Sequence, residues 1–147
     1  MRCVALLLIT CILLACQPST PKQTISFAVA QAPLNLDPRY ATDAASERVN
    51  RLIYQPLVDF DNASKPAWIL ARSDALSDKS YRFTLIKPAV FHHGKVLTSA
   101  DVKATYESLL ALKDAPHATE FSHIRAIHTP DKNTVIFDLK QAQSYKY

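Results

Sequence analysis

Five histidines are the residues most able to hold a metal ion, and two of them, His92 and His93, are adjacent. Imidazole nitrogens are common zinc ligands, so a metal-dependent hydrolase built on the histidines is one alternative. Adjacent residues of an extended chain point to opposite sides, however, and no Cys or carboxylate completes a tight ligand spacing beside the pair. The other three are His117, His123 and His128. We therefore predict no metal site and no cofactor.

Nucleophilic catalysis is the second chemistry to consider. Asp37 could be a catalytic carboxylate, and Ser46 or Ser99 a nucleophile. Neither serine lies in a Gly-x-Ser-x-Gly elbow, and the sequence places no histidine beside either one. A single Gly in 147 residues also argues against phosphate-cradling loops. Turn and capping roles suffice for all three residues, with Asp37 bonded to its own loop, and we predict that the chain is not an enzyme.

Cys16 ends a run that is typical of an export signal. A basic residue, Arg2, precedes an uncharged apolar stretch from Val4 to Ala15, which is shorter than the roughly twenty residues of a membrane-spanning helix. The ending Leu-Leu-Ala-Cys resembles the bacterial lipobox, in which the thiol is acylated and the signal is cut before it. We predict a lipoprotein signal peptide over residues 1–15, and a lipidated Cys16 with a flexible tether over residues 16–23.

Composition sets further limits on the mature chain. The formal net charge of +4 falls to +3 because only Arg2 is lost with the signal. The remaining Lys and Arg residues are scattered, so we predict no nucleic-acid partner. Cys3 and Cys11 also leave with the signal, so no intramolecular disulfide can form in the body. Residues 24–147 have the length of one small domain, which we expect to be a monomer held by its core.

The pattern of apolar and turn-forming residues predicts an α/β or α+β arrangement. A strand is predicted at Ile25–Val29 and a structured loop at Ala32–Tyr40. A helix capped by Thr42 or Asp43 is expected next, and its apolar face consists of Ala45, Val49, Leu52 and Ile53. The elements expected after it are a strand and turn at 57–62, an apolar link at 66–71, a strand at 81–85 and a helix led by Thr98–Asp101. The last is a hairpin of 124–128 and 134–139 around a turn at 129–133.

Aromatic side chains leave two alternatives open. Tyr54, Trp68, Tyr81 and Phe83 could stack against a ligand, or they could form the core that a small domain without disulfides needs. We predict a core position for Phe83. The indole N–H of Trp68 needs a partner, which leaves its place open.

The order of these segments resembles the family-five solute-binding proteins of ABC transporters. Val90 to Val102 is the most specific stretch, with its Phe-His-x-Gly turn, its Leu-Thr and its Ala-Asp-Val helix start, although His93 stands where Asp is common. The other matching stretches are 35–46, 52–58 and 81–85. The resemblance implies the N-terminal part of a class II periplasmic-binding-protein-like two-lobed fold, with a mixed sheet, flanking helices and the second lobe absent. Residues 24–147 would then be a truncated family domain.

Function follows from the resemblance as an expectation. It implies the substrate-binding component of an ABC transporter, which captures peptides or related solutes in the periplasm or cell envelope and delivers them to a permease. Cys16 would provide the lipid anchor. The segment after the first strand usually lines the cleft, which makes Ala30, Gln31, Ala32 and Pro33 candidate ligand contacts through their backbone. A structural or interaction lipoprotein, a fragment that binds no solute, and a metal-binding protein remain alternatives.

Overall fold

The computed structural model describes residues 26–142 of the chain. Along the sequence these residues form α2 (Ala44–Ile53), β1 (Val58–Phe60), β2 (Pro66–Trp68), β3 (Ala71–Ala75), β4 (Ser80–Leu85), α3 (Ser99–Ala111), the 3-10 helix η1 (Pro116–Ala118), β5 (Ile124–Asp131) and β6 (Thr134–Leu139). None of the helices in this part of the chain is long and apolar enough to cross a membrane.

The main sheet contains four strands in the order β3-β4-β6-β5. Every pairing is antiparallel, and Tyr81 lies opposite Phe137 while Phe83 lies opposite Val135. Side chains alternate between the two faces of a strand, so Val135, Phe137 and Leu139 of β6 all point to one buried side. The strands described here are therefore antiparallel, whereas the resemblance implied a mixed sheet.

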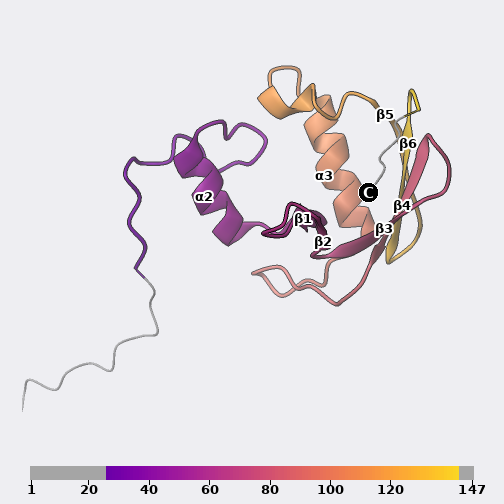
Figure 1. The fold of residues 1–147 in the computed structure, drawn as a ribbon, viewed down its shortest axis with the longest axis horizontal. Helices are drawn as coiled ribbons and strands as arrows, with labels where there is room; N and C mark the ends of the chain where they lie inside the picture. The colour runs from indigo at the N-terminus through magenta and orange to yellow at the C-terminus, as the bar shows by residue number, and fades with distance from the viewer. Residues whose placement is uncertain (1–25, 143–147) are drawn as a thin grey trace, which may run out of the picture.

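Helix α3 covers the buried face of this sheet (Figure 1). Aromatic edges meet in the core, where the ring of Tyr106 makes T-shaped contacts with Phe121 and Phe137, and Phe83 makes one with Phe137. Such edge-to-face pairs add to the stability gained from burial. The predicted core position of Phe83 is confirmed. The buried members of the cluster are Val102, Ile124, Ile127, Val135, Phe137 and Leu139.

Helix α2 stands apart from the sheet, and the short β1–β2 hairpin lies between them (Figure 1). Asp43 caps α2, because its carboxylate accepts hydrogen bonds from the backbone N–H groups of Ala45 and Ser46. The prediction of an apolar, buried face on this helix is wrong in part. Leu52 and Ile53 are exposed, and the buried positions are Ala45, Ser46 and Asn50.

Other expectations also need correction. Residues 26–30 form no strand, and Phe27 is 59% exposed; the strand predicted at 25–29 has no pairing partner in the described chain. The predicted apolar link at 66–71 contains β2 and the start of β3, neither of which was expected. Strand β5 continues to Asp131, so the hairpin turn is shorter than the predicted 129–133.

The capping motif before α3 is as predicted. The carboxylate of Asp101 accepts hydrogen bonds from the backbone N–H and the hydroxyl of Thr98, at 2.9 and 2.8 Å. An acidic group in the first turn also suits the helix dipole. Helix α3 therefore begins at a position that its sequence specifies strongly.

Candidate functional site: a groove between α2 and α3

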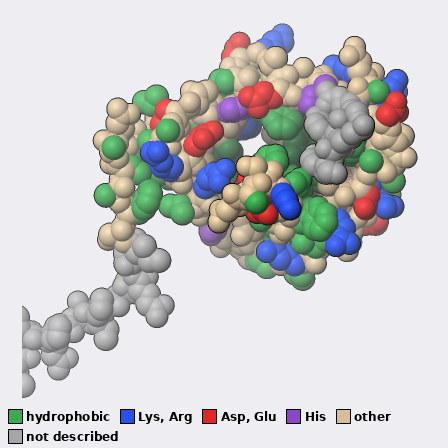
Figure 2. Space-filling view, viewed as in Figure 1, with side chains coloured by type: hydrophobic (Ala, Val, Ile, Leu, Met, Phe, Trp, Pro, Cys, Tyr) green, Lys and Arg blue, Asp and Glu red, His purple; other side chains and the backbone are tan. Residues whose placement is uncertain are grey.

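A groove of about 710 Å³ opens between α2 and α3. Its walls come from the end of α2 with the link to β1, from the loop that follows β4, and from one side of α3. A volume of this size lies within the range of sites that hold small ligands. On the face shown in Figure 2, Lys, Arg, Asp and Glu side chains are interspersed, and hydrophobic side chains show in the hollow between the α2 side and the rest of the molecule.

The first wall is the C-terminal end of α2. Tyr54 ends the helix with its N–H bonded to the Asn50 carbonyl at 2.8 Å, and its hydroxyl donates to the Leu36 carbonyl at 3.3 Å. Tyr54 could either stack against a ligand or form part of the core. Its side chain is 46% exposed, so the core position is wrong. Arg51 lies on the same wall, 3.6 Å from the carboxylate of Asp59.

The second wall is the loop that carries Lys87 to His92. It folds back on itself through a bridge between Val90 and Val96, and its turn is closed by the N–H of Gly94 bonded to the Phe91 carbonyl at 2.8 Å. Gly94 has φ of +90°, which side-chain-bearing residues rarely adopt. The only glycine of the chain thus lies where the turn of this wall requires one. His92 occupies the turn itself, as predicted.

The third wall is α3, from which Asp101, Thr105 and Tyr106 line the groove. Lys95 approaches Asp101 to 2.6 Å, and this hydrogen bond, with those from Thr98, holds the pKa of the Asp101 carboxyl below its usual value. Burial raises the pKa of the Tyr106 phenol, so it stays a neutral hydroxyl at physiological pH.

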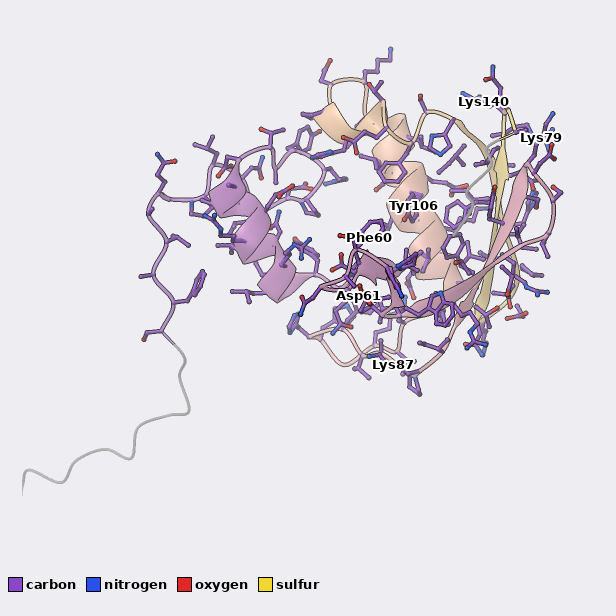
Figure 3. All side chains as sticks on the ribbon, in the orientation of Figure 1. Phe60, Asp61, Lys79, Lys87, Tyr106 and Lys140 are labelled. Carbon is purple, nitrogen blue, oxygen red and sulfur yellow. The ribbon has the colours of Figure 1, made fainter. Side chains whose placement is uncertain are left out.

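The electrostatic balance of the groove favours an anionic group on its occupant. Lys95 already neutralises Asp101. Lys87 makes no ion pair with any residue between 26 and 142, and Arg51 makes only the long one to Asp59. Tyr106 projects from α3, while Lys87 lies on the loop after β4 and Phe60 and Asp61 mark the β1–β2 hairpin (Figure 3). The groove therefore combines apolar walls with two cations able to pair with a carboxylate.

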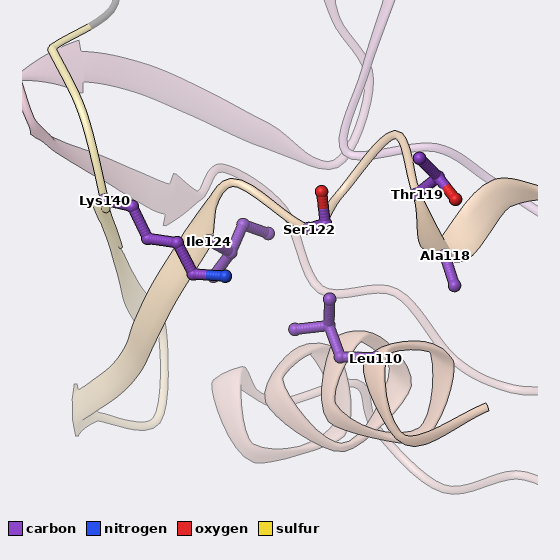
Figure 4. Close-up of a pocket in the computed structure, with 6 residues that line it drawn as sticks. All are labelled: Leu110, Ala118, Thr119, Ser122, Ile124 and Lys140. Atoms are coloured by element: carbon purple, nitrogen blue, oxygen red, sulfur yellow. The ribbon is translucent and has the colours of Figure 1, made fainter. Parts of the chain in front are cut away.

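A smaller and more open depression of about 390 Å³ lies at the other end of α3 (Figure 4). Leu110 and Ile124 form its apolar part, and Thr119, Ser122 and Lys140 supply polar groups. All three polar residues are surface side chains. This depression lacks the three-sided enclosure of the groove.

The residues predicted as sites from the sequence lie elsewhere. Cys16 is outside the described residues. Ala30, Gln31 and Ala32 are exposed and Pro33 is half-buried, on irregular backbone that precedes α2, and none of them lines the groove. Their predicted contact with ligand stays a prediction. Sequence reasoning missed the groove, because its walls come from segments far apart in the chain.

Other residues with chemical potential have structural partners. Asp37 accepts hydrogen bonds from the Arg39 backbone and guanidinium, as its loop role predicted. Ser46 bonds to Asp43, and Ser99 bonds to the Asp131 carbonyl. Trp68, whose place was open, is 47% exposed with the Arg72 guanidinium 4.6 Å above its ring.

The histidines are dispersed over the fold. His93 stacks on Phe91, His128 bonds to Asp138, and His117 bonds to Ala41 and Glu120. Between residues 26 and 142, no group of three or more His, Cys, Asp or Glu side chains could hold a metal ion. The alternative of a histidine-based hydrolase finds no geometric support in this part of the chain.

Comparison with known proteins gives one family match. Residues 65–147 match the model of the bacterial extracellular solute-binding proteins, family 5 Middle. The chain is 34% identical over 130 residues to the Probable D,D-dipeptide-binding periplasmic protein DdpA of Escherichia coli K12. That alignment covers 84% of this chain and 25% of the relative, so the chain spans about a quarter of the relative's length.

Solved structures show the same likeness. AgaA of A. tumefaciens R10, in complex with agropinic acid, is 34% identical with a TM-score of 0.71, over 76% of this chain and 23% of that one. The oligopeptide-binding protein AppA of Bacillus subtilis, in complex with a nonapeptide, is 28% identical with a TM-score of 0.62, over 69% and 21% of the two chains. The fold is therefore that of the N-terminal part of periplasmic binding proteins, as predicted.

Proposed function

The chain belongs to the bacterial extracellular solute-binding proteins of family 5, and from that premise we propose that it serves as a substrate-binding component of an ABC importer. It captures peptides or related solutes in the periplasm or cell envelope and delivers them to a permease. The family match over residues 65–147 is the observation that carries this proposal. Transport proteins of this kind bind without chemistry, which agrees with the expectation that the chain is not an enzyme.

The names and bound ligands of the relatives indicate which solutes to consider for this chain. One is named for D,D-dipeptides, one was solved with a nonapeptide and one with agropinic acid. Peptides carry a carboxylate, and the groove offers Arg51 and Lys87 beside apolar walls. A peptide with its carboxylate near Lys87 and an apolar side chain against Leu52 and Val90 would use both properties of the groove.

Backbone contacts belong to the same proposal. Ala30, Gln31 and Ala32 have N–H and C=O groups on exposed backbone, which an extended peptide could pair with as a strand does. Pro33 has no N–H and could offer only its carbonyl. These contacts would add main-chain recognition to the side-chain contacts of the groove.

Membrane attachment is proposed through Cys16. The sequence predicts cleavage after residue 15, acylation of the Cys16 thiol and a flexible tether over residues 16–23, from which a monomeric domain would work. Mass spectrometry of the chain purified from the cell envelope tests this directly. A diacylglycerol-modified N-terminal Cys16 is expected, and Cys16→Ser should leave the chain without the lipid and with its signal peptide uncleaved. An unmodified wild-type Cys16 would overturn this part.

Solute binding is tested by melting the purified chain with a D,D-dipeptide, a nonapeptide and agropinic acid. Binding to the folded state alone raises the melting temperature with ligand concentration. We expect at least one of these to raise it saturably, and Lys87→Ala to weaken the effect. No shift with any of them would favour the alternative of a structural lipoprotein that binds no solute.

A further inference from the structure

His117 joins two parts of the chain that are far apart in sequence. It lies in η1, and its Nε2 is 2.8 Å from the carbonyl of Ala41, in the loop that leads into α2. Its Nδ1 is 3.1 Å from the carboxylate of Glu120, in the turn after η1. In Figure 1 the loop before α2 approaches η1 at the end of α3. Both ring nitrogens thus have acceptors as partners, and only the protonated imidazole can donate to both.

Few other hydrogen bonds or ion pairs hold the segment of residues 34–53, here called the α2 arm. Within the described chain, the bond from His117 is the only hydrogen bond between the α2 arm and residues 70–142. The arm also has the 3.6 Å pair of Arg51 with Asp59, in which the Arg51 side chain is 73% exposed. Exposed pairs of this kind contribute little to stability.

We propose that His117 is a protonation-sensitive clamp, which holds the α2 arm against the end of α3 when its imidazole is charged and loosens it when the imidazole is neutral. Because the C-terminal end of α2 forms one wall of the groove, the clamp would set how firmly that wall is held. This role is independent of which solute the groove binds and of whether it binds one.

The surroundings of the ring support this role. The charged groups that act on it are Glu120, from the turn after η1, and Glu47, from α2, and both are acidic. The hydrogen bond to the Ala41 carbonyl, then those two carboxylates, raise the pKa of the His117 imidazole above its ordinary value. When the ring is neutral, it can donate to only one partner, and with Nε2–H kept on Ala41 the Nδ1 lone pair would face the Glu120 carboxylate.

The direction of the pH effect follows from the raised pKa. A group that binds its proton more tightly in the folded chain stabilises the fold fully below its ordinary value, which is about 6.5 for histidine. That contribution is lost as the pH rises through the raised value. The clamp is therefore expected to be closed at a pH below about 6.5 and to weaken as the pH rises through the raised pKa of His117.

An NMR pH titration of the ¹⁵N-labelled full chain, purified from the cell envelope in detergent, tests the proposal. The His117 ring signal should titrate with a midpoint above 6.5. The amides of Thr42 and Glu47 should titrate with the same midpoint, and exchange of the α2 amides, corrected for intrinsic rates, should quicken several-fold above it.

Two variants and a matched control separate the clamp from a merely structural role. His117→Gln keeps an N–H donor for Ala41 but should abolish the titration of the α2 amides. Glu120→Gln should lower the titration midpoint of His117 while the fold persists. This variant still tests the proposal if His117→Gln fails to fold. His128→Gln, which removes a histidine paired with Asp138 on the sheet, should leave the α2 response unchanged. Unaltered titration of the α2 amides in His117→Gln, or a His117 midpoint at or below 6.5, would overturn the clamp.

Discussion

The two sides of the groove are held in different ways. Helix α3 is fixed to the sheet by burial, with Val135 fully buried and Phe137 only 5% exposed beneath it. The α2 arm is braced within itself by the cap at Asp43 and the hydroxyl of Ser46, and among the described residues its only hydrogen bond to residues 70–142 is the clamp at His117. Burial stabilises α3 cooperatively with the whole sheet, whereas the arm can open locally. The difference indicates a groove with one firm wall and one adjustable wall.

The largest effect should come from breaking the firm side. Phe137→Ala removes a ring that contacts Phe83 and Tyr106, and a cavity of this kind costs about 3–5 kcal/mol. Denaturant unfolding should show this loss in the single transition of the sheet and α3. Leu52→Ala, on the exposed face of α2, is the matched control and should change the free energy of unfolding by less than about 0.5 kcal/mol. Equal losses in both variants would contradict the comparison.

The next effect concerns the loop wall. Gly94→Ala places a side chain at φ of +90° but meets no atom within 4 Å, so its cost is backbone strain alone. We expect a loss of about 1–2 kcal/mol in the free energy of unfolding, measured by the same denaturant titration. Gly94→Asn should cost less, because Asn tolerates a left-handed conformation better. If both variants are neutral, the turn does not constrain this wall.

A smaller effect is expected on the adjustable side. Ser46→Ala removes the acceptor of the Asn35 N–H, a 3.0 Å bond, at a position that is fully buried. The loss should be about 1 kcal/mol and confined to the arm. Hydrogen exchange should quicken in α2 and stay unchanged in α3. Ser108→Ala on the exposed side of α3 is the control, and uniform quickening in Ser46→Ala would argue against a separately held arm.

The smallest effect is a dependence on acid. The pKa of Asp101 is lowered by its bonds to Lys95 and Thr98, so its carboxylate stabilises the fold above the ordinary value of about 3.9. This contribution is lost as the pH falls through the lowered value. When the melting temperature is measured against pH, Asp101→Asn should make its fall at acidic pH less steep. The part of this curve that does not depend on pH should keep its shape. An unchanged acid limb would show that the capping carboxylate does not contribute.

Sequence patterns predicted the firm side better than the adjustable one. The Thr98 to Asp101 cap, the alternation of Tyr81, Phe83 and Leu85, and the final hairpin all report local preferences that the fold keeps. Strands β2 and β3 are short and lack clear alternation, so only their pairing with distant segments reveals them. The prediction of a strand at 25–29 was wrong, because alternating apolar residues form a strand only where another strand pairs with them.

The candidate site was beyond sequence reasoning for a related reason. Arg51, Lys87 and Tyr106 line one groove only because the antiparallel connections return the chain to the same place. Each residue on its own carries no signal of ligand binding. The family resemblance predicted the right class of protein, and the contacts it implied at Ala30–Pro33, which do not line the groove, stay a prediction.

The most direct test of this account is to titrate the ¹⁵N-labelled full chain with the solute that raises its melting temperature and to map the shifted amides. We expect saturable shifts at Tyr54, Lys87 and Tyr106, with further shifts at Ala30 to Ala32 if their backbone also binds, and none at His128 on the far edge strand. Shifts that avoid all three groove residues, or no saturable shift with a D,D-dipeptide, a nonapeptide or agropinic acid, would contradict it.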